Sequence, residues 1–478
     1  MQHAYPAIEM YIDGAWTPGT QGDHEPVINP ATGDTLGTVP HASNADLDAA
    51  LSAAARGFEV WRDTPIEART RILTTAARLV RESAAEIGTI MTLEQGKPLT
   101  EAQGEAMRSA GTLQWDLEEA RRAYGRTIPV DSNTQLLVLH EPIGPVAAFT
   151  PWNFPSGAPM RKIAAALSAG CSIILKASEE VPGTACALVR CFEKAGLPPG
   201  VLNLVFGVPA AISAKLIASP ITRLLAFTGS IPVGKHLAGL AAAQMKPAVM
   251  ELGGHAAVIV CADADPVMAA RSSAAGKFIN AGQVCTSPSR FFVHESLVAA
   301  FTEAFVAAAR AQVVGDGFDK KTTMGPLANP RRLAAAEQLV SDAVGRGAKV
   351  LCGGERLGGS GFFFAPTVLS EVPEEALIMQ AEPFSPIAPI IAFAELDEAI
   401  RLANSLPYGL AGYAYTRSAA TANRLMRRME AGILSINHTS GSTIEAPSGG
   451  VKQSGYGREG GAESLNGYLV TKRVWHRF

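Results

Sequence analysis

Short apolar runs that alternate with helix-like segments between residues 146 and 254 constrain the fold of this chain most strongly. Each run has the length of a buried strand, and the segments between the runs read as helices. Strand and helix alternating at this pace predict a parallel sheet with right-handed crossovers, which is the doubly wound α/β class. The runs are VAAFT (146–150), SIILKA (172–177), VLNLVFG (201–207), RLLAFTGS (223–230) and AVMELGG (248–254).

The alternation restarts after residue 256, with AAVIV, RFFVHE, AKVLCGG and SPIAPIIAF, and predicts a second α/β domain. In doubly wound sheets, ligands bind at the carboxyl ends of the strands, where phosphates meet helix N-termini. A dinucleotide is therefore the natural candidate for the ligand. No G-x-G-x-x-G follows a strand, however, and the nearest candidate loop, FTGSIPVG (227–234), is also what a turn with an N-cap looks like.

Three other segments complete the predicted organisation. Residues 40–122 carry apolar positions at helical spacing and predict a run of helices. The segment 125–141 alternates like a β-hairpin with DSN as its turn, and its LLVL run normally needs a partner, so we expect a homodimer or a dimer of dimers. The glycine-rich segment 448–461 reads as a loop.

Composition excludes several classes of function. The chain has 478 residues, of which 47% are hydrophobic and 18% charged, enough for two or three globular domains. A net charge of -3 without a basic run leaves no electrostatic footprint for nucleic-acid binding. The N-terminus shows no secretory signal, and the longest apolar-rich stretch, 163–175, is too short to span a bilayer. We therefore expect a soluble, cytoplasmic enzyme.

The six cysteines are scattered, form no Cys-x-x-Cys pair and lie far from any histidine cluster. Neither a metal site nor a disulfide framework is predicted, and each cysteine is by default a small buried hydrophobe. Cys285 differs because NAGQVC places it in a short turn between a helix-like run and an apolar one. From the local pattern, a packing residue and a nucleophile are both open.

Seven short stretches follow one another along the chain: TPWNFP (150–155), LKASEE (175–180), FTGSIPVG (227–234), MELGGH (250–255), NAGQVC (280–285), EPFSP (382–386) and SGGVKQSGYGRE (448–459). Together they resemble the aldehyde dehydrogenase superfamily, from about residue 10 to the C-terminus. That family oxidises an aldehyde to an acid with NAD(P), through a cysteine thiohemiacetal and a thioester.

The resemblance implies an aldehyde dehydrogenase-like α/β fold with three parts. A Rossmann-type NAD-binding domain is expected over 1–123 and 143–253, a second α/β catalytic domain over 254–459, and a small β oligomerisation element over 124–142 and 460–478. The catalytic cleft is expected between the two large domains.

The resemblance also implies three catalytic residues. Cys285 matches the nucleophile, but a free thiol with a pKa of about 8.5 is mostly protonated at neutral pH and needs activation. Asn153 matches the oxyanion-hole residue, beside the Cys285 backbone N–H. Glu251 matches the general base that deprotonates the hydrolytic water. Alternatively, Asn153 caps the following helix and Glu251 is a surface residue at a strand end.

Matches to the family's cofactor positions predict NAD. Lys176 and Glu179 match positions that hold the adenosine ribose. A carboxylate at Glu179 would accept from the 2′-OH and repel a 2′-phosphate, so NADP is the less favoured alternative. Trp152 is expected beside the nicotinamide and Glu382 on its ribose. The remaining expected cofactor contacts are Ser178, Gly229, Ser230, Gly234, Leu252, Gly253 and Phe384.

The chain departs from the commonest family pattern at three positions. His255 stands where lysine usually follows ELGG, Ser385 replaces a glycine in EPFGP, and Ser448 replaces a phenylalanine before GGVK. None of these departures removes a catalytic group.

Three residues bear on the aldehyde. Arg161, Arg290 and Ser442 match positions at which succinate-semialdehyde dehydrogenases grip the far carboxylate of the substrate, and a guanidinium fork suits that group. Each arginine would otherwise be a surface or inter-domain ion pair. The chain also looks like bacterial α-ketoglutaric-semialdehyde dehydrogenases. We expect succinate semialdehyde as the small-molecule substrate, with α-ketoglutaric semialdehyde or a broad range of aldehydes as alternatives.

Two functions of other classes are less well supported. A cofactor-independent thiol hydrolase or acyl transferase would need a histidine paired with Cys285, and no motif places one there. The candidate cofactor residues would then have no purpose. A non-catalytic relative would have lost Cys285, Asn153 or Glu251, and all three are present.

Overall fold

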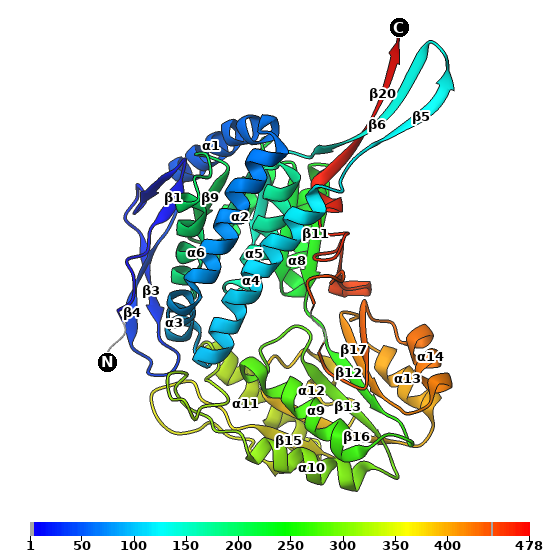
Figure 1. Ribbon diagram of the computed structural model, residues 1–478. Coiled ribbons are helices and arrows are strands. Elements are labelled where there is room, and N and C mark those ends of the chain that lie inside the picture. The colour runs from blue at the N-terminus through cyan, green and yellow to red at the C-terminus, as the bar shows by residue number, and fades with distance from the viewer. Residues whose placement is uncertain (1–3, 441–442) are drawn as a thin grey trace.

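The computed structural model describes residues 4–440 and 443–478. Two large sheets with their helices form the body, and a three-stranded ribbon projects away from it (Figure 1). A separate hairpin, β3 (His24–Ile28) and β4 (Thr35–Pro40), lies along the N-terminal flank.

The first sheet contains the parallel strands predicted between residues 146 and 254. They are β7 (Val146–Phe149), β8 (Ile173–Lys176), β9 (Leu202–Val205), β10 (Leu224–Gly229) and β11 (Ala248–Leu252). Their spatial order is β11-β10-β7-β8-β9. The chain runs from β7 to one side and then returns to the other side, so the strand order reverses between β7 and β10. A reversal of this kind opens a crevice at the carboxyl ends of the strands.

The first sheet gains antiparallel edge strands that the sequence patterns did not predict. At one edge lie β1 (Met10–Ile12) and β2 (Ala15–Thr17). At the other edge, β19 (Gly455–Tyr456) pairs with β11. The expectation that 448–461 is only a loop was therefore wrong at these two residues. Gly455 has φ +115°, and a Cβ there would lie 1.9 Å from the Met250 carbonyl oxygen, so only glycine allows this approach.

The helical run predicted over residues 40–122 is confirmed. It consists of α1 (Asn44–Asp63), α2 (Ile66–Glu82), α3 (Ala84–Gln95) and α4 (Leu99–Ala120). A capping box between Ser43 and Asp46 begins α1, and Gly96, in a left-handed conformation, ends α3. Trp61 of α1 is fully buried, and its indole N–H donates to the Leu167 carbonyl at 2.9 Å. The crossover helices are α5 (Gly157–Ala169), α6 (Pro182–Lys194), α7 (Pro209–Ala218) and α8 (Ile231–Ala243).

The second α/β unit, predicted after residue 256, is built on a seven-stranded sheet of order β14-β15-β16-β13-β12-β17-β18. Only β14 runs antiparallel to its neighbour. The chain passes from the first sheet to the second between Leu252 and Ala256. The strands are β12 (Ala256–Val260), β13 (Pro288–His294), β14 (Lys349–Cys352), β15 (Thr367–Ser370), β16 (Ile387–Phe393), β17 (Ala411–Tyr415) and β18 (Ile433–Ile436). The helices are α9 (Pro266–Phe278), α10 (Val298–Arg310), α11 (Pro330–Gly345), α12 (Leu377–Gln380), α13 (Leu396–Asn404) and α14 (Ala419–Arg428).

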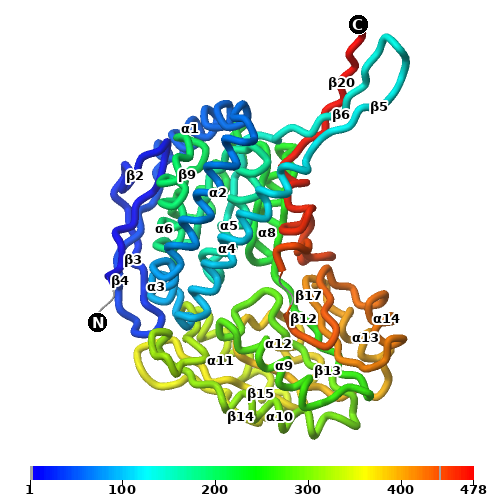
Figure 2. Tube along the Cα trace, viewed as in Figure 1, coloured from blue at the N-terminus to red at the C-terminus, as the bar shows by residue number. Residues whose placement is uncertain are grey.

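The hairpin predicted over 125–141 is confirmed as β5 (Arg126–Asp131) and β6 (Thr134–Pro142). The C-terminal strand β20 (Leu469–Arg477) pairs with β6 and completes the ribbon, whose far end carries the C-terminus (Figures 1 and 2). Apolar side chains on the ribbon, such as Val130 and Trp475, are exposed. Within the described ranges, no helix is long and apolar enough to cross a membrane.

We expect Gly455→Ala to lower the free energy of unfolding by about 1–3 kcal/mol, because β19 would have to leave β11 or take up a strained backbone. The matched control is Gly239→Ala in α8, where a Cβ would meet no atom within 4 Å. Alanine favours a helix over glycine, so this control should gain about 0.4–1 kcal/mol. Urea unfolding followed by circular dichroism measures both, and equal shifts would contradict the role of Gly455.

Candidate active site

The candidate residues from the first half of the chain gather at one edge of the first sheet. Lys176 ends β8, Gly229 ends β10, and Glu251 is the last residue but one of β11. Asn153, in the turn after β7, lies beside the point where the strand order reverses. The carboxyl ends of parallel strands meet at one edge, so these residues share the crevice that the topology opens.

Cys285 comes from the second unit, in the segment between α9 and β13. Three successive residues with left-handed backbone bring it there: Asn280 with φ 50°, Ala281 with φ 53° and Gly282 with φ 73°. A Cβ on Gly282 would lie 2.2 Å from the Ser385 carbonyl oxygen, so the turn packs tightly against the EPFSP segment. The left-handed backbone and the packing of Gly282 against Ser385 together fix the position of the turn that carries the thiol.

Burial first, and then the carboxylates of Glu251 and Glu382, raise the pKa of the Cys285 thiol to about 12, against the opposing charge of Arg161. In this state the thiol is protonated at neutral pH. Nucleophilic attack therefore needs a proton acceptor or an added positive charge at the site.

The Asn153 side chain is 5% exposed and aims at the cysteine turn. Its Nδ2 donates to the Gln283 carbonyl at 3.0 Å. A primary amide has two N–H groups, so this bond fixes the amide and leaves the second N–H for a ligand. Asn153 does not cap the next helix, because α5 begins at Ser156 and Gly157, whose N–H groups donate to Glu105 Oε1, both at 2.9 Å.

Glu251 is buried at 8% exposure rather than lying on the surface. Its Oε1 has no hydrogen-bond partner among the described residues. Burial raises the pKa of this carboxyl, while Lys162, Arg161 and Arg458 lower it. A shielded carboxylate with a free oxygen suits proton abstraction from water or from a thiol.

Lys162 is not among the predicted site residues, yet it is fully buried beside Glu251. Its Nζ donates to Thr228 Oγ1 at 2.6 Å and pairs with Glu459. Burial lowers the pKa of this ammonium group, and the charge of Glu251 raises it. The available indication was a second charged residue, directly after Arg161, at the start of the apolar helical run IAAAL.

The residues expected at the adenosine end of the cofactor lie close together. Lys176 Nζ lies 2.6 Å from Glu179 Oε1, which also accepts from the Gly207 N–H at 3.0 Å. Ser178 is buried and accepts from the Glu180 N–H. On the other side of the reversal, Ser230 is the N-cap residue of α8 and makes no side-chain cap, and a Cβ on Gly234 would strike Leu252.

The expected nicotinamide end joins the two units. Glu382 Oε1 accepts from the Gly254 N–H at 3.1 Å, and a Cβ on Gly253 would lie 2.4 Å from Glu382 Oε2. The rings of Trp152 and Phe384 meet edge to face at 5.5 Å. This cradle of glycines, carboxylates and an aromatic ring fits a nicotinamide dinucleotide, which accepts a hydride when bound. No group of three potential metal ligands occurs in the part of the chain that the structure describes.

The three residues expected to bind the substrate differ in where the structure places them. Arg161 reaches the site: its charge acts on Cys285 and Glu251, and its buried Nη1 has no partner within the described ranges. Ser442 lies outside the described residues.

Arg290 is bound to main-chain atoms instead of facing a substrate with free donors. It is 3% exposed, and its guanidinium donates to the carbonyls of His255, Leu402 and Ala403 at 3.0–3.2 Å. All of these acceptors are main-chain atoms, so Arg290 ties β13 to α13 and to the passage between the two sheets. The expected grip on the substrate does not fit this residue, because four of its five N–H donors are already committed to main-chain carbonyls.

Two of the three residues that depart from the family pattern are buried, and the third forms backbone hydrogen bonds within the protein. The buried His255 ring lies between Ser289 Oγ and the Ile378 carbonyl, each at 2.8 Å, and burial lowers its pKa well below the usual value. Ser385 is fully buried, and Ser448 exchanges backbone hydrogen bonds with Glu459 at 2.7 and 2.9 Å.

Comparison with known proteins agrees with this geometry. The sequence profile of the aldehyde dehydrogenase family matches residues 16–474. The 4-(hydroxymethyl)benzenesulfonate dehydrogenase TsaD1 of Comamonas testosteroni is 46% identical over 98% of both chains. The 3-sulfolactaldehyde dehydrogenase of Pseudomonas putida is 40% identical over 98% of this chain and 96% of its own. The NADP(+) succinate-semialdehyde dehydrogenase GabD of Escherichia coli is 40% identical over 96% of both.

Solved structures agree as well. Succinate-semialdehyde dehydrogenase from Burkholderia pseudomallei has a TM-score of 0.97 at 40% identity, covering 99% of this chain and 98% of its own. An NAD+ complex of aldehyde dehydrogenase from Bacillus cereus has a TM-score of 0.96 at 32% identity, covering 99% and 97%. The chain belongs to the aldehyde dehydrogenase family and has that family's fold.

The high pKa of Cys285 predicts slow alkylation of the cofactor-free protein. With a pKa of about 12 instead of 8.5, the thiolate fraction at pH 8 falls by a factor on the order of 10³. The rate with iodoacetamide should rise about tenfold per pH unit from pH 7 to 10, since the thiolate is the reactive form. Glu251→Gln removes a charge that raises the pKa and should accelerate the reaction at pH 8.

The Cys285→Ser variant gives the background from the other cysteines. A rate that levels off near pH 8 would contradict the protonated thiol.

Proposed function

We propose that Cys285 is the nucleophile of an NAD(P)-dependent aldehyde oxidation, with Asn153 as oxyanion donor and Glu251 as general base. Cys285 Sγ loses its proton to Glu251 and bonds to the carbonyl carbon, and the alkoxide oxygen accepts from Asn153 Nδ2 and the Cys285 N–H. A nicotinamide dinucleotide held beside Trp152 and Glu382 would accept the hydride that the carbonyl carbon gives up, which would leave a thioester on Cys285. Glu251 gives that first proton to the solvent and then takes a proton from the water that attacks the thioester. The C–S bond breaks, the acid is released, and the leaving thiolate of Cys285 takes its proton back from Glu251.

The observation that carries the choice of aldehyde is the buried Arg161 Nη1, which has no hydrogen-bond partner within the described ranges. A buried donor without an acceptor is costly, so an anion on the substrate would be favoured beside it. Succinate semialdehyde, whose far end is a carboxylate, is the proposed substrate. The same chemistry admits α-ketoglutaric semialdehyde.

A sulfonated aldehyde is a second candidate, favoured by a specific observation. TsaD1 is 46% identical to this chain, whereas GabD is 40% identical. A sulfonate presents oxygens to a guanidinium as a carboxylate does, and Arg161 would make this contact alone, because Arg290 is bound to main-chain carbonyls.

For the cofactor we propose NAD. The Glu179 carboxylate, held by Lys176 and by the Gly207 N–H, stands at the position expected for the adenosine ribose. A carboxylate accepts from a 2′-OH and repels a 2′-phosphate. The relatives carry both kinds of cofactor in their names, so this preference rests on Glu179.

We expect a kcat/KM preference for anionic aldehydes of at least 10- to 100-fold over uncharged aldehydes of matched size, which corresponds to about 1–3 kcal/mol. The assay compares succinate semialdehyde with butanal and 4-formylbenzenesulfonate with benzaldehyde, each with NAD+ and NADP+. Arg161→Met should abolish the preference mainly through KM. The control Arg290→Lys should lower the melting temperature and keep the preference.

Equal rates for charged and uncharged aldehydes would remove the anion site. Absence of cofactor reduction with every aldehyde would reject Cys285 as an oxidative nucleophile.

We also propose that the ribbon joins copies of this chain into a homodimer or a dimer of dimers. Trp475 and Phe478 are 57% and 78% exposed, and an exposed apolar sheet of this kind is normally covered.

Light scattering after size exclusion should therefore give a mass of at least twice the chain, and Trp475→Asp should lower it. The control Met245→Asp changes an equally apolar side chain, 91% exposed on the body, and should leave the mass unchanged. A wild-type monomer would contradict the proposal.

A further inference from the structure

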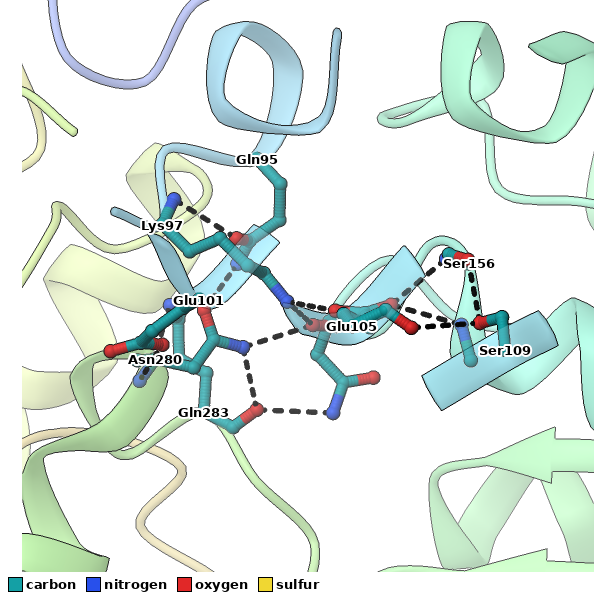
Figure 3. Close-up of polar contacts among 10 residues, drawn as sticks. Gln95, Lys97, Glu101, Glu105, Ser109, Ser156, Asn280 and Gln283 are labelled. Carbon is teal, nitrogen blue, oxygen red and sulfur yellow. Dashed lines mark hydrogen bonds and ion pairs between the residues drawn. The ribbon is translucent and has the colours of Figure 1, made fainter. Parts of the chain in front are cut away.

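A buried ion pair lies behind the expected oxyanion donor. Lys97, just after α3, and Glu105 of α4 are each 2% exposed, and Lys97 Nζ lies 2.5 Å from Glu105 Oε2 (Figure 3). Neither residue belongs to the substrate or cofactor positions described above. A buried ion pair is commonly neutral in stability compared with well-packed apolar residues, so stability alone does not account for it.

The pair holds the PWNFPSG turn from both ends. Lys97 Nζ donates to the main-chain carbonyl of Asn153 at 2.9 Å. On the other side, Glu105 Oε1 accepts from the N–H groups of Ser156 and Gly157, both at 2.9 Å. Ser109, one turn further along α4, adds a contact between its Oγ and that of Ser156 at 2.6 Å. The position of Asn153 along this turn is therefore set by α4.

The same cluster reaches the cysteine turn (Figure 3). Asn280 Nδ2 donates to the Asn153 carbonyl at 2.9 Å, so this oxygen accepts from Lys97 and Asn280 together. Gln95 Nε2 donates to Asn280 Oδ1 at 2.8 Å, and Gln95 Oε1 accepts from the Lys97 N–H at 3.1 Å. One hydrogen-bonded cluster thus joins the turn that carries Asn153 to the turn that leads to Cys285.

We propose that Glu105 is a positioning residue for the oxyanion hole: through Lys97 and the start of α5 it holds Asn153 at the distance from Cys285 that the developing alkoxide requires. The inference rests on the proposed role of Asn153. An oxyanion donor must lie 2.7–3.1 Å from the oxygen, and a misplacement of about 1 Å can reduce a rate about 100-fold. Glu105 touches neither substrate nor cofactor and acts only through this alignment.

The test is a double-mutant cycle between Glu105 and Asn153. Asn153→Ala should lower kcat about 100- to 1000-fold, since it removes an oxyanion donor. Glu105→Gln should lower kcat about 10- to 100-fold with KM for the aldehyde changed less than twofold. In the Asn153→Ala background, Glu105→Gln should cost less than about twofold more, because the donor that it positions is already gone. Glu105→Asp, which keeps the charge, should recover part of the loss.

The matched control is Glu94→Gln. Glu94 is also 2% exposed and accepts from the first N–H groups of a helix, those of Gly183 and Thr184 in α6, both at 2.8 Å. This variant removes the same kind of buried carboxylate without touching the Asn153 turn. Any fold-loss of kcat in Glu94→Gln, including a loss caused by lower stability, should multiply with the fold-loss of kcat in Asn153→Ala.

A second readout separates alignment from general loosening of the site. Alkylation of Cys285 by iodoacetamide forms no oxyanion, so Glu105→Gln should leave its rate within twofold. If Glu105→Gln fails to fold, the paired variant Lys97→Met/Glu105→Gln removes both buried charges together and enters the same cycle.

Each outcome decides a separate point. Losses that multiply in the Glu105 and Asn153 cycle, or an unchanged kcat in folded Glu105→Gln, would overturn the positioning role. An unchanged kcat in Asn153→Ala would overturn the proposed role of Asn153 itself, and with it the inference.

Discussion

The left-handed turn at Asn280 and Ala281 is the constraint on which the rest of the site depends. A non-glycine residue in this conformation costs about 1–2 kcal/mol, and such residues persist only where the surroundings over-determine them. The side chain of Asn280 supplies that determination through Gln95 and the Asn153 carbonyl. The bonds that hold the cysteine turn in its strained shape are thus also bonds to the opposite wall, so the two walls of the crevice are set together.

The sequence predicted those parts of the fold whose interactions are local. The apolar runs from 146 to 254, the helices from residue 44 and the ribbon hairpin each carry their own periodicity and turn residues. The strands β1, β2 and β19 have three residues or fewer, too short for a period. Their pairing depends on contacts with distant segments, such as the approach of Gly455 to Met250, which no local pattern contains.

The candidate site divides along similar lines. Residues at strand ends, such as Lys176 and Glu251, were predictable in place because topology alone brings strand ends together. The predicted contact between Arg290 and the substrate did not hold, because the identity of a residue in a strand does not reveal to which face of the sheet its side chain is directed. Lys162 and Glu105 were missed because a charged residue in a helix is ordinarily exposed, and its burial becomes visible only when the partner helix is known.

The path of the C-terminal segment, seen in Figure 2 running from the lower unit back along the upper one, has a consequence for synthesis. Leu465 and Tyr468 belong to the core of the first sheet, and β19 forms its edge. These residues leave the ribosome only after the whole second sheet. The first unit, although it is synthesised earlier, therefore lacks part of its core and one edge strand until the second unit has been synthesised. The first unit to be made is thus the last to be completed.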